Sequence, residues 1–208
     1  MIGSLIVVGF FALGCLLGWA GVLPEWIMNS DLSMYVLYLL MFQVGLSIGC
    51  DKKLKEILCS IRPKLLLVPL ATITGSLIFA ALISLLITKW SVFDCLAIGS
   101  GFAYYSLSSI LITQLKEPSI GVQLASELGT IALMANIIRE IFALLGAPIF
   151  VKYFGRLAPI CAGGATTMDT TLPIITKYSG KDLVFVSIFH GILVDFSVPF
   201  LVSFFCQL

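Results

Sequence analysis

The sequence predicts an all-α membrane protein that crosses the bilayer several times, and three observations lead to this class. Of 208 residues, 60% are hydrophobic and only 11% are charged, whereas soluble domains are about half apolar and about a quarter charged. The apolar residues come in runs of the roughly 20 residues that a helix needs to span the hydrocarbon core. A soluble chain of this length could not bury so much apolar surface, since about a third of its unfolded surface stays exposed.

The apolar runs define about seven membrane segments, joined by short polar connections. They are Ile2–Leu23, Leu32–Gly49, Leu65–Thr88, Phe93–Leu115, Ile120–Val151, Ala158–Thr176 and Leu183–Phe205. The first run lacks a basic flank and is too long for the apolar core of a signal peptide, so we expect a membrane helix there. No linker or low-complexity tract interrupts the series. We therefore expect a single membrane domain over residues 1–208.

The basic residues predict the orientation. The connection Asp51–Lys64 carries five of the twelve Lys and Arg residues, and cytoplasmic loops are enriched in these residues. Counting seven crossings from this loop places the N-terminus inside and the C-terminus outside. The same count puts Lys116 inside and Lys89 outside, although a re-entrant segment would alter it.

Two of the runs contain residues that disfavour a continuous helix. Gly99–Ser109 places glycine and hydroxyl side chains within an apolar run, and Ala162–Pro173 combines paired glycines, four threonines, Asp169 and a proline. Non-helical backbone at membrane depth must be buried in protein or line a watery cavity. Two broken or re-entrant segments that face each other near the midplane are typical of inverted-repeat secondary transporters. The alternative is that glycine and serine only allow close helix packing.

The fifth run has small and polar residues along one stripe, which we expect to face the bundle. The stripe comprises Gly121, Ala125, Gly129, Ala132, Asn136, Arg139, Ala143 and Ala147. The opposite side, including Leu124 and Leu128, is predicted to face lipid. An arginine at membrane depth needs a partner, and Asp169 is the candidate, either in a substrate site or in a purely structural clamp. Glu127 lies off the stripe and is predicted to be interfacial.

His190, the only histidine, is either a proton acceptor or a hydrogen-bonded packing residue, and Asp195 lies off its face as a weaker candidate. The six cysteines form no Cys-x-x-Cys pair and are interpreted as small helix residues. We predict no metal and no cofactor. A net charge of +1 argues against nucleic acid as a partner.

An enzyme is disfavoured. Asp94 and Asp169 could imitate an intramembrane aspartyl protease, but Asp94 lies at a helix end and Asp169 lacks the Gly-x-Gly-Asp setting. No serine–histidine pair has the sequence context of a nucleophile elbow, and no Cys/His cluster has zinc spacing. A channel or a structural subunit of a membrane complex remains an alternative to a transporter.

Five motifs in order resemble the bacterial lysine exporter (LysO-type) family. They are Gly101–Thr113, Glu127–Gly129, Ala135–Glu140, Gly163–Pro173 and His190–Gly191. The resemblance implies export of L-lysine and its analogue thialysine across the bacterial cytoplasmic membrane, with proton antiport as the driving mechanism. Thr167 stands where the family usually has serine and Tyr104 where it often has tryptophan. Asp195 stands where a neutral residue is more usual, so no role is carried onto it.

The resemblance and the hydroxyl-rich stretch together give the candidate site. Substrate-binding residues are predicted at Ser106, Ser108, Asn136, Arg139, Glu140, Thr166, Thr167, Asp169 and Thr170. Proton coupling is predicted at Asp169, Glu140 and His190. Family members usually carry about three more helices before the part that matches Ile2. The resemblance therefore implies a partner: a separate small membrane protein that supplies these helices, or a second copy of this chain.

Overall fold

The computed structural model describes residues 13–14, 16–21, 35, 39, 42, 46 and 63–208. The chain divides into two compact units, Met1–Gly45 and Leu46–Leu208. In the first unit, residues 13–14 and 16–19 are helical. Most of the predicted segments Ile2–Leu23 and Leu32–Gly49, and nearly all of the connection Asp51–Lys64, lie outside the described residues. The elements discussed below all belong to the second unit.

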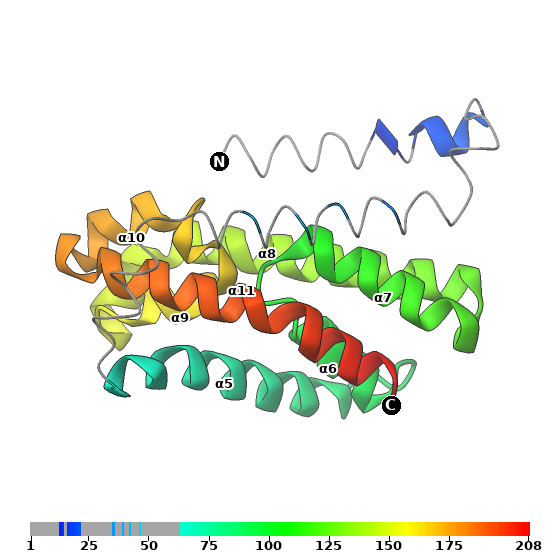
Figure 1. The fold of residues 1–208 in the computed structure, drawn as a ribbon, viewed down its shortest axis with the longest axis horizontal. Coiled ribbons are helices and arrows are strands. Elements are labelled where there is room, and N and C mark those ends of the chain that lie inside the picture. Colours follow the sequence, from blue (N-terminus) through cyan, green and yellow to red (C-terminus); the bar gives the residue numbers. More distant parts are fainter. Residues whose placement is uncertain are drawn as a thin grey trace. The chain divides into compact units, whose positions relative to one another are not determined.

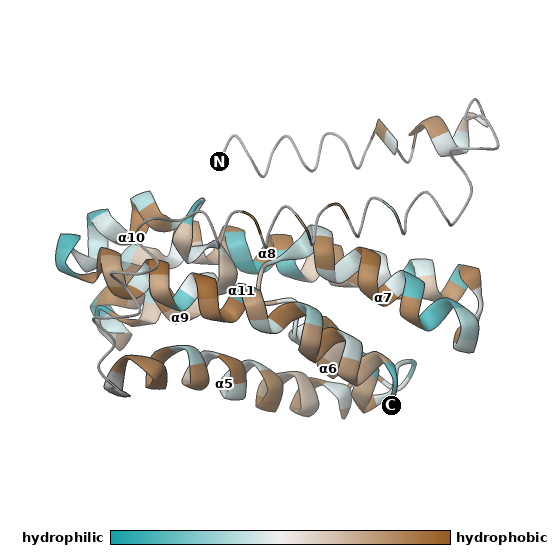
Figure 2. Cartoon of the chain, viewed as in Figure 1, coloured by the Kyte–Doolittle hydropathy of each residue, from teal (hydrophilic) through white to brown (hydrophobic). Residues whose placement is uncertain are grey.

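Three helices of the second unit are long and apolar enough to cross a bilayer. They are α5 (Leu67–Ser84), which follows the short 3-10 helix η1 (Pro63–Leu66), α8 (Val122–Phe154) and α11 (Val184–Cys206). All three correspond to predicted segments. Figure 2 shows that α5 and α11 are hydrophobic along most of their length. No strand occurs in residues 63–208, so the predicted helical class is confirmed for this part of the chain.

The predicted segment Phe93–Leu115 is not one helix but a helical hairpin. It comprises α6 (Val92–Gly99) and α7 (Tyr105–Ile120), joined by Ser100–Tyr104. With 8 residues, α6 is about 12 Å long, far short of a hydrocarbon core of about 30 Å. Its start is fixed by a capping box, in which the Ser91 hydroxyl accepts from the Asp94 amide at 3.1 Å and the Asp94 carboxylate accepts from the Ser91 amide at 3.0 Å.

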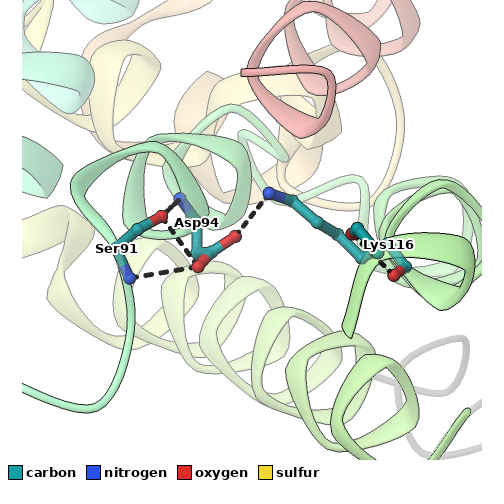
Figure 3. A network of polar contacts seen from close by, with 4 residues as sticks. Ser91, Asp94 and Lys116 are labelled. Atoms are coloured by element: carbon teal, nitrogen blue, oxygen red, sulfur yellow. Dashed lines mark hydrogen bonds and ion pairs between the residues drawn. The ribbon is translucent and has the colours of Figure 1, made fainter. Parts of the chain in front are cut away.

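Two ion pairs show that this hairpin returns to the end where it starts. Lys116 Nζ, near the end of α7, lies 2.8 Å from Asp94 Oδ1 on the first turn of α6, and both side chains are nearly buried. Figure 3 shows the Asp94 carboxylate between Ser91 and Lys116. Lys89, just after α5, also pairs with Glu127 near the start of α8. The prediction that Lys89 and Lys116 lie on opposite sides of the membrane is therefore wrong. Hydropathy cannot tell a hairpin from a crossing helix of the same length.

The second interrupted segment is also a hairpin, and it enters from the other end of the bundle (Figure 1). Its parts are α9 (Ala158–Gly163), the 3-10 helix η2 (Gly164–Met168) and α10 (Leu172–Ser179), followed by the 3-10 helix η3 (Lys181–Leu183). Arg156, before α9, donates from Nε to the Ser179 carbonyl at 2.6 Å and pairs with Asp182. Both predicted interruptions are therefore present, and each returns to its own end.

The long helix α8 presents its small residues to the interior, as predicted. Ala125, Ala132 and Ala143 are buried, whereas Phe142 and Leu145 are exposed. Leu128 was predicted to face lipid but is fully buried. Leu128 is buried because the two hairpins cover more of α8 than its stripe of small residues. The helices that contact α8 are α6, α7, α9 and α10.

Candidate functional site

The two hairpins meet at their tips. The Ala165 amide donates to the Phe102 carbonyl oxygen at 2.8 Å, which joins the second break directly to the first. Phe102 and Ala103 have φ values of 42° and 72°, which L-residues rarely adopt. Gly164 has φ 62°, and a Cβ there would overlap the Phe102 carbonyl oxygen. Only glycine meets both demands. The prediction that Gly99–Ser109 approaches the second break is confirmed.

Asn136, on α8, holds the first break in place. Its Oδ1 accepts from the Ala103 amide at 2.8 Å, and its Nδ2 donates to the Ala132 carbonyl at 2.9 Å and to the Ser108 hydroxyl at 3.4 Å. The Ser108 hydroxyl donates to the Tyr104 carbonyl at 2.7 Å. Asn136 therefore satisfies a backbone amide that the break releases, and Ser108 bonds to the carbonyl at the start of α7. Ser106, in the first turn of α7, is half-buried.

Arg139 does not pair with Asp169, which corrects the predicted partner. Its Nε and Nη2 donate to the carbonyl oxygens of Ala162 and Cys161 at 3.0 and 3.1 Å. Its Nη1 donates to the Ser76 hydroxyl on α5 at 3.1 Å. The carbonyls at a helix C-terminus lack intrahelical partners and carry partial negative charge. Because α9 ends at the break, its last carbonyl groups are free to accept from Arg139. Their partial negative charge balances the guanidinium, and a carboxylate is not needed.

The threonines of the second break bond mostly to its own backbone. The Thr166 hydroxyl donates to the Gly163 carbonyl at 2.8 Å, and the Thr171 hydroxyl donates to the Thr166 carbonyl at 3.0 Å. The Thr167 hydroxyl lies 2.8 Å from the Gly164 carbonyl and 2.9 Å from the Ser187 carbonyl of α11. Thr170 differs, because its buried hydroxyl oxygen has no hydrogen-bond partner among the described residues.

His190 is fully buried between two threonines. Its Nε2 lies 2.9 Å from the Thr72 hydroxyl of α5, and its Nδ1 lies 3.1 Å from the Thr167 hydroxyl of η2. Thr72 can donate to the Val68 carbonyl at 3.1 Å, and Thr167 has two carbonyl acceptors of its own. The imidazole therefore links α5, α11 and the second break. This geometry accommodates both interpretations of His190, packing and proton transfer.

Three carboxyl groups gather beside the meeting point of the hairpins. Asp169, at the end of η2, is exposed, whereas Glu140 on α8 and Asp195 on α11 are buried. The Asp169 charge interacts with both Glu140 and Asp195. Tyr104, at the start of α7, lies near Asp169 and Asp195, and Tyr105 lies near Glu140 and Asp169. The site thus contains the two predicted carboxylates.

Asp195 is the carboxyl group to which the family resemblance gave no role. It lies four residues after Gly191, which puts both on one face of α11. A Cβ on Gly191 would lie 2.8 Å from the Met168 amide nitrogen, so this face packs directly on the second break. The four-residue spacing from Gly191 to Asp195 could have indicated that Asp195 lies at the site. That spacing can be interpreted only when the second hairpin is known to pack against α11 at Gly191.

The fold and this site define a multi-pass integral membrane protein with two broken helical hairpins joined at their tips. The family model of the lysine exporter LysO matches residues 8–206, and the chain belongs to this family. The resemblance recognised in the sequence is therefore confirmed. The family is one of transporters, which agrees with the prediction that the chain is not an enzyme.

Two relatives show how much of the family's length the chain covers. It is 33% identical to the lysine exporter LysO of Escherichia coli (strain K12) over 177 residues, which are 85% of this chain and 55% of that protein. It is 32% identical over 197 residues to a Haemophilus influenzae protein named "Putative lysine exporter", and this match covers 93% of each chain. The chain thus spans about half of the first relative and nearly all of the second. No solved structure matches it.

Proposed function

We propose that this protein exports L-lysine, and close analogues such as thialysine, across the bacterial cytoplasmic membrane by proton antiport. The observation that supports this most directly is the contact between the two breaks, Ala165 to Phe102, beside Asp169. Discontinuous helices that meet from opposite sides form the midplane binding sites of many secondary transporters. The names of the two relatives support lysine as the substrate.

The helix ends at the breaks suit a zwitterion that carries an additional ammonium group. The N-termini of α7 and α10 and the C-termini of α6 and α9 all lie at the breaks. A helix N-terminus favours an anion, so we assign the lysine carboxylate to these amides. Arg139 is a weaker candidate for that role, because its donors already bond to α9 and Ser76. Asp169 and Glu140 would bind the ammonium groups.

The remaining predicted residues have supporting roles in this proposal. Ser106, Thr166 and Thr170 would contact the polar groups of lysine at the breaks. Asn136, Ser108 and Thr167 would keep the breaks in shape, because their polar atoms bond to backbone groups of the hairpins. His190 would transmit proton binding to the second break through Thr167.

The architecture also supports an inverted repeat. The helix α5 is followed by a hairpin that enters from one end, and α8 is followed by a hairpin that enters from the other. Such repeats place the shared site between them. We further propose that residues 1–208 act as one membrane domain. It would work with a separate small membrane protein or a second copy of this chain.

The hairpins strengthen the proposed orientation, with the C-terminus outside. The end of the bundle that holds Lys89 and Lys116 carries no other described basic residue. The opposite end holds Lys64, Lys152, Arg156, Lys177 and Lys181, and four more basic residues come shortly before Lys64 in the sequence. That end should therefore be cytoplasmic. A periplasm-specific reporter fused after Leu208 should be active, and activity of a cytoplasm-specific one there would reverse the orientation.

The central test replaces the accessible carboxylate. We expect Asp169→Asn to abolish counterflow of labelled lysine in liposomes at normal abundance, because the amide keeps the shape but removes the negative charge that would bind a lysine ammonium group. Abundance should hold, since Arg139 does not depend on Asp169. The matched control is Glu127→Gln, which removes a carboxylate that pairs with Lys89. Normal counterflow by Asp169→Asn at normal abundance would refute this role for Asp169.

A further inference from the structure

Asp195 is a buried carboxyl group whose surroundings do not satisfy it. The residue is 4% exposed, and its buried Oδ2 has no hydrogen-bond partner among the described residues. The ion pairs of the described residues do not include it. A carboxylate removed from water without a partner is strongly disfavoured unless it takes up a proton or a cation.

The charged and titratable groups that surround Asp195 in the described part of the chain do not supply that cation. From the second hairpin Asp169 faces it, and from the start of α7 Tyr104 lies near it. On its own helix His190 bonds to Thr72 and Thr167. The helix α5 has no titratable residue.

The charged side chains at the end of the bundle that holds Lys116 pair with one another. On α6, Asp94 pairs with Lys116 of α7, and Cys95 is adjacent to Asp94 in the sequence. Among the residues that the structure describes, the neighbour of Asp195 that these pairs leave is another carboxyl group, Asp169.

Burial separates the roles of these two neighbouring carboxyl groups. Asp169 is exposed and can meet a lysine ammonium group without rearrangement. Asp195 is 4% exposed, and Gly191, one turn before it on α11, packs against Met168, the residue next to Asp169. A cation bound at Asp169 would therefore favour the charged form of Asp195, and its departure would favour the neutral form.

We propose that Asp195 is the proton-binding residue that couples lysine movement to proton movement. Lysine binding at Asp169 breaks the O–H bond of the Asp195 carboxylic acid, and the proton leaves to water. When lysine departs, a proton from water on the other side returns to the carboxylate. This is reciprocal linkage between two sites. The inference rests on the proposed antiport, and it names the residue that carries the proton.

The test separates exchange from proton coupling in liposomes that contain the full chain. One assay follows exchange of labelled for unlabelled L-lysine without a pH gradient, and the other follows net lysine flux when a pH gradient is imposed. For Asp195→Asn, which imitates the neutral acid, we expect exchange within about twofold of wild type and loss of the gradient-driven acceleration. In weakly buffered detergent solution, lysine should release protons from the wild type and not from this variant. Asp182→Asn, at the exposed pair with Arg156, is the matched control and should behave as wild type.

The outcomes distinguish the two proposals. If the wild type shows no acceleration by a pH gradient, the antiport proposal fails, and this inference fails with it. If the wild type responds and Asp195→Asn responds equally, antiport stands and Asp195 is not its proton carrier. Loss of exchange in a folded Asp195→Asn would make Asp195 a substrate ligand and would also overturn the inference. Should the asparagine variant fail to fold, Asp195→Ser carries the same expectations.

Discussion

The role of Arg139 as a cap on α9 leads to a quantitative prediction for Arg139→Lys. The guanidinium donates to two α9 carbonyls at 3.0 and 3.1 Å and to Ser76 at 3.1 Å. An ammonium group on a flexible stem cannot reproduce this planar fork, so at least one α9 carbonyl loses its partner. A hydrogen bond to a charged group contributes about 1.5–3 kcal/mol. For a chain of this size each kcal/mol shifts Tm by about 2–4 °C, so the loss of one such bond predicts a fall in Tm of about 3–12 °C.

Thermal unfolding of the purified protein in detergent measures this effect. The matched control is Arg156→Lys, because Arg156 also donates to a helix-terminal carbonyl, Ser179, but its side chain is half exposed. Exposed ion pairs contribute about 0–1 kcal/mol, so its Tm should change by only a few degrees at most. If Arg139→Lys keeps the wild-type Tm but raises the KM for lysine, Arg139 is a substrate ligand, and the capping argument is refuted.

Two further substitutions test the contacts around the hairpins. Gly191→Ala would place a Cβ 2.8 Å from the Met168 amide nitrogen and should cost about 1–3 kcal/mol and slow transport. The control is Gly75→Ala, whose added Cβ meets no atom of the described residues within 4 Å. Equal Tm and flux in the two variants would contradict the close packing. Asp94→Asn leaves the nearly buried Lys116 unpaired and should cost about 3–5 kcal/mol. Adding Lys116→Met should recover most of that loss in thermal unfolding, and no recovery would argue against the ion pair as the cause.

The interruptions could be predicted from sequence because their cause is local. Paired glycines, threonines and a proline disfavour a membrane helix whatever surrounds them, and Gly164 and Thr166 lie in the break that this composition marks. The buried stripe of α8 was also predictable, since it depends only on periodicity. The partner of Arg139 was not, because the break itself creates the free carbonyls. A sequence search for opposite charges finds Asp169 and misses the backbone of Cys161 and Ala162.

Length and charge together explain why the first interrupted segment folds back. At 16 residues, α7 is about 24 Å long, so α6 and α7 in line would nearly suit a bilayer, and hydropathy alone favours a crossing. In that arrangement Asp94 and Lys116 would lie at opposite ends of one rod, about 33 Å apart at the helical rise per residue. Folding back at Ser100–Tyr104 instead lets the two charges neutralise each other at 2.8 Å in nearly buried positions, where unpaired charges cost most. It also leaves two helix ends inside the bundle, and Asn136 and the second hairpin satisfy backbone groups between them. The same fold-back that pairs the charges thus builds the polar centre on which transport would depend.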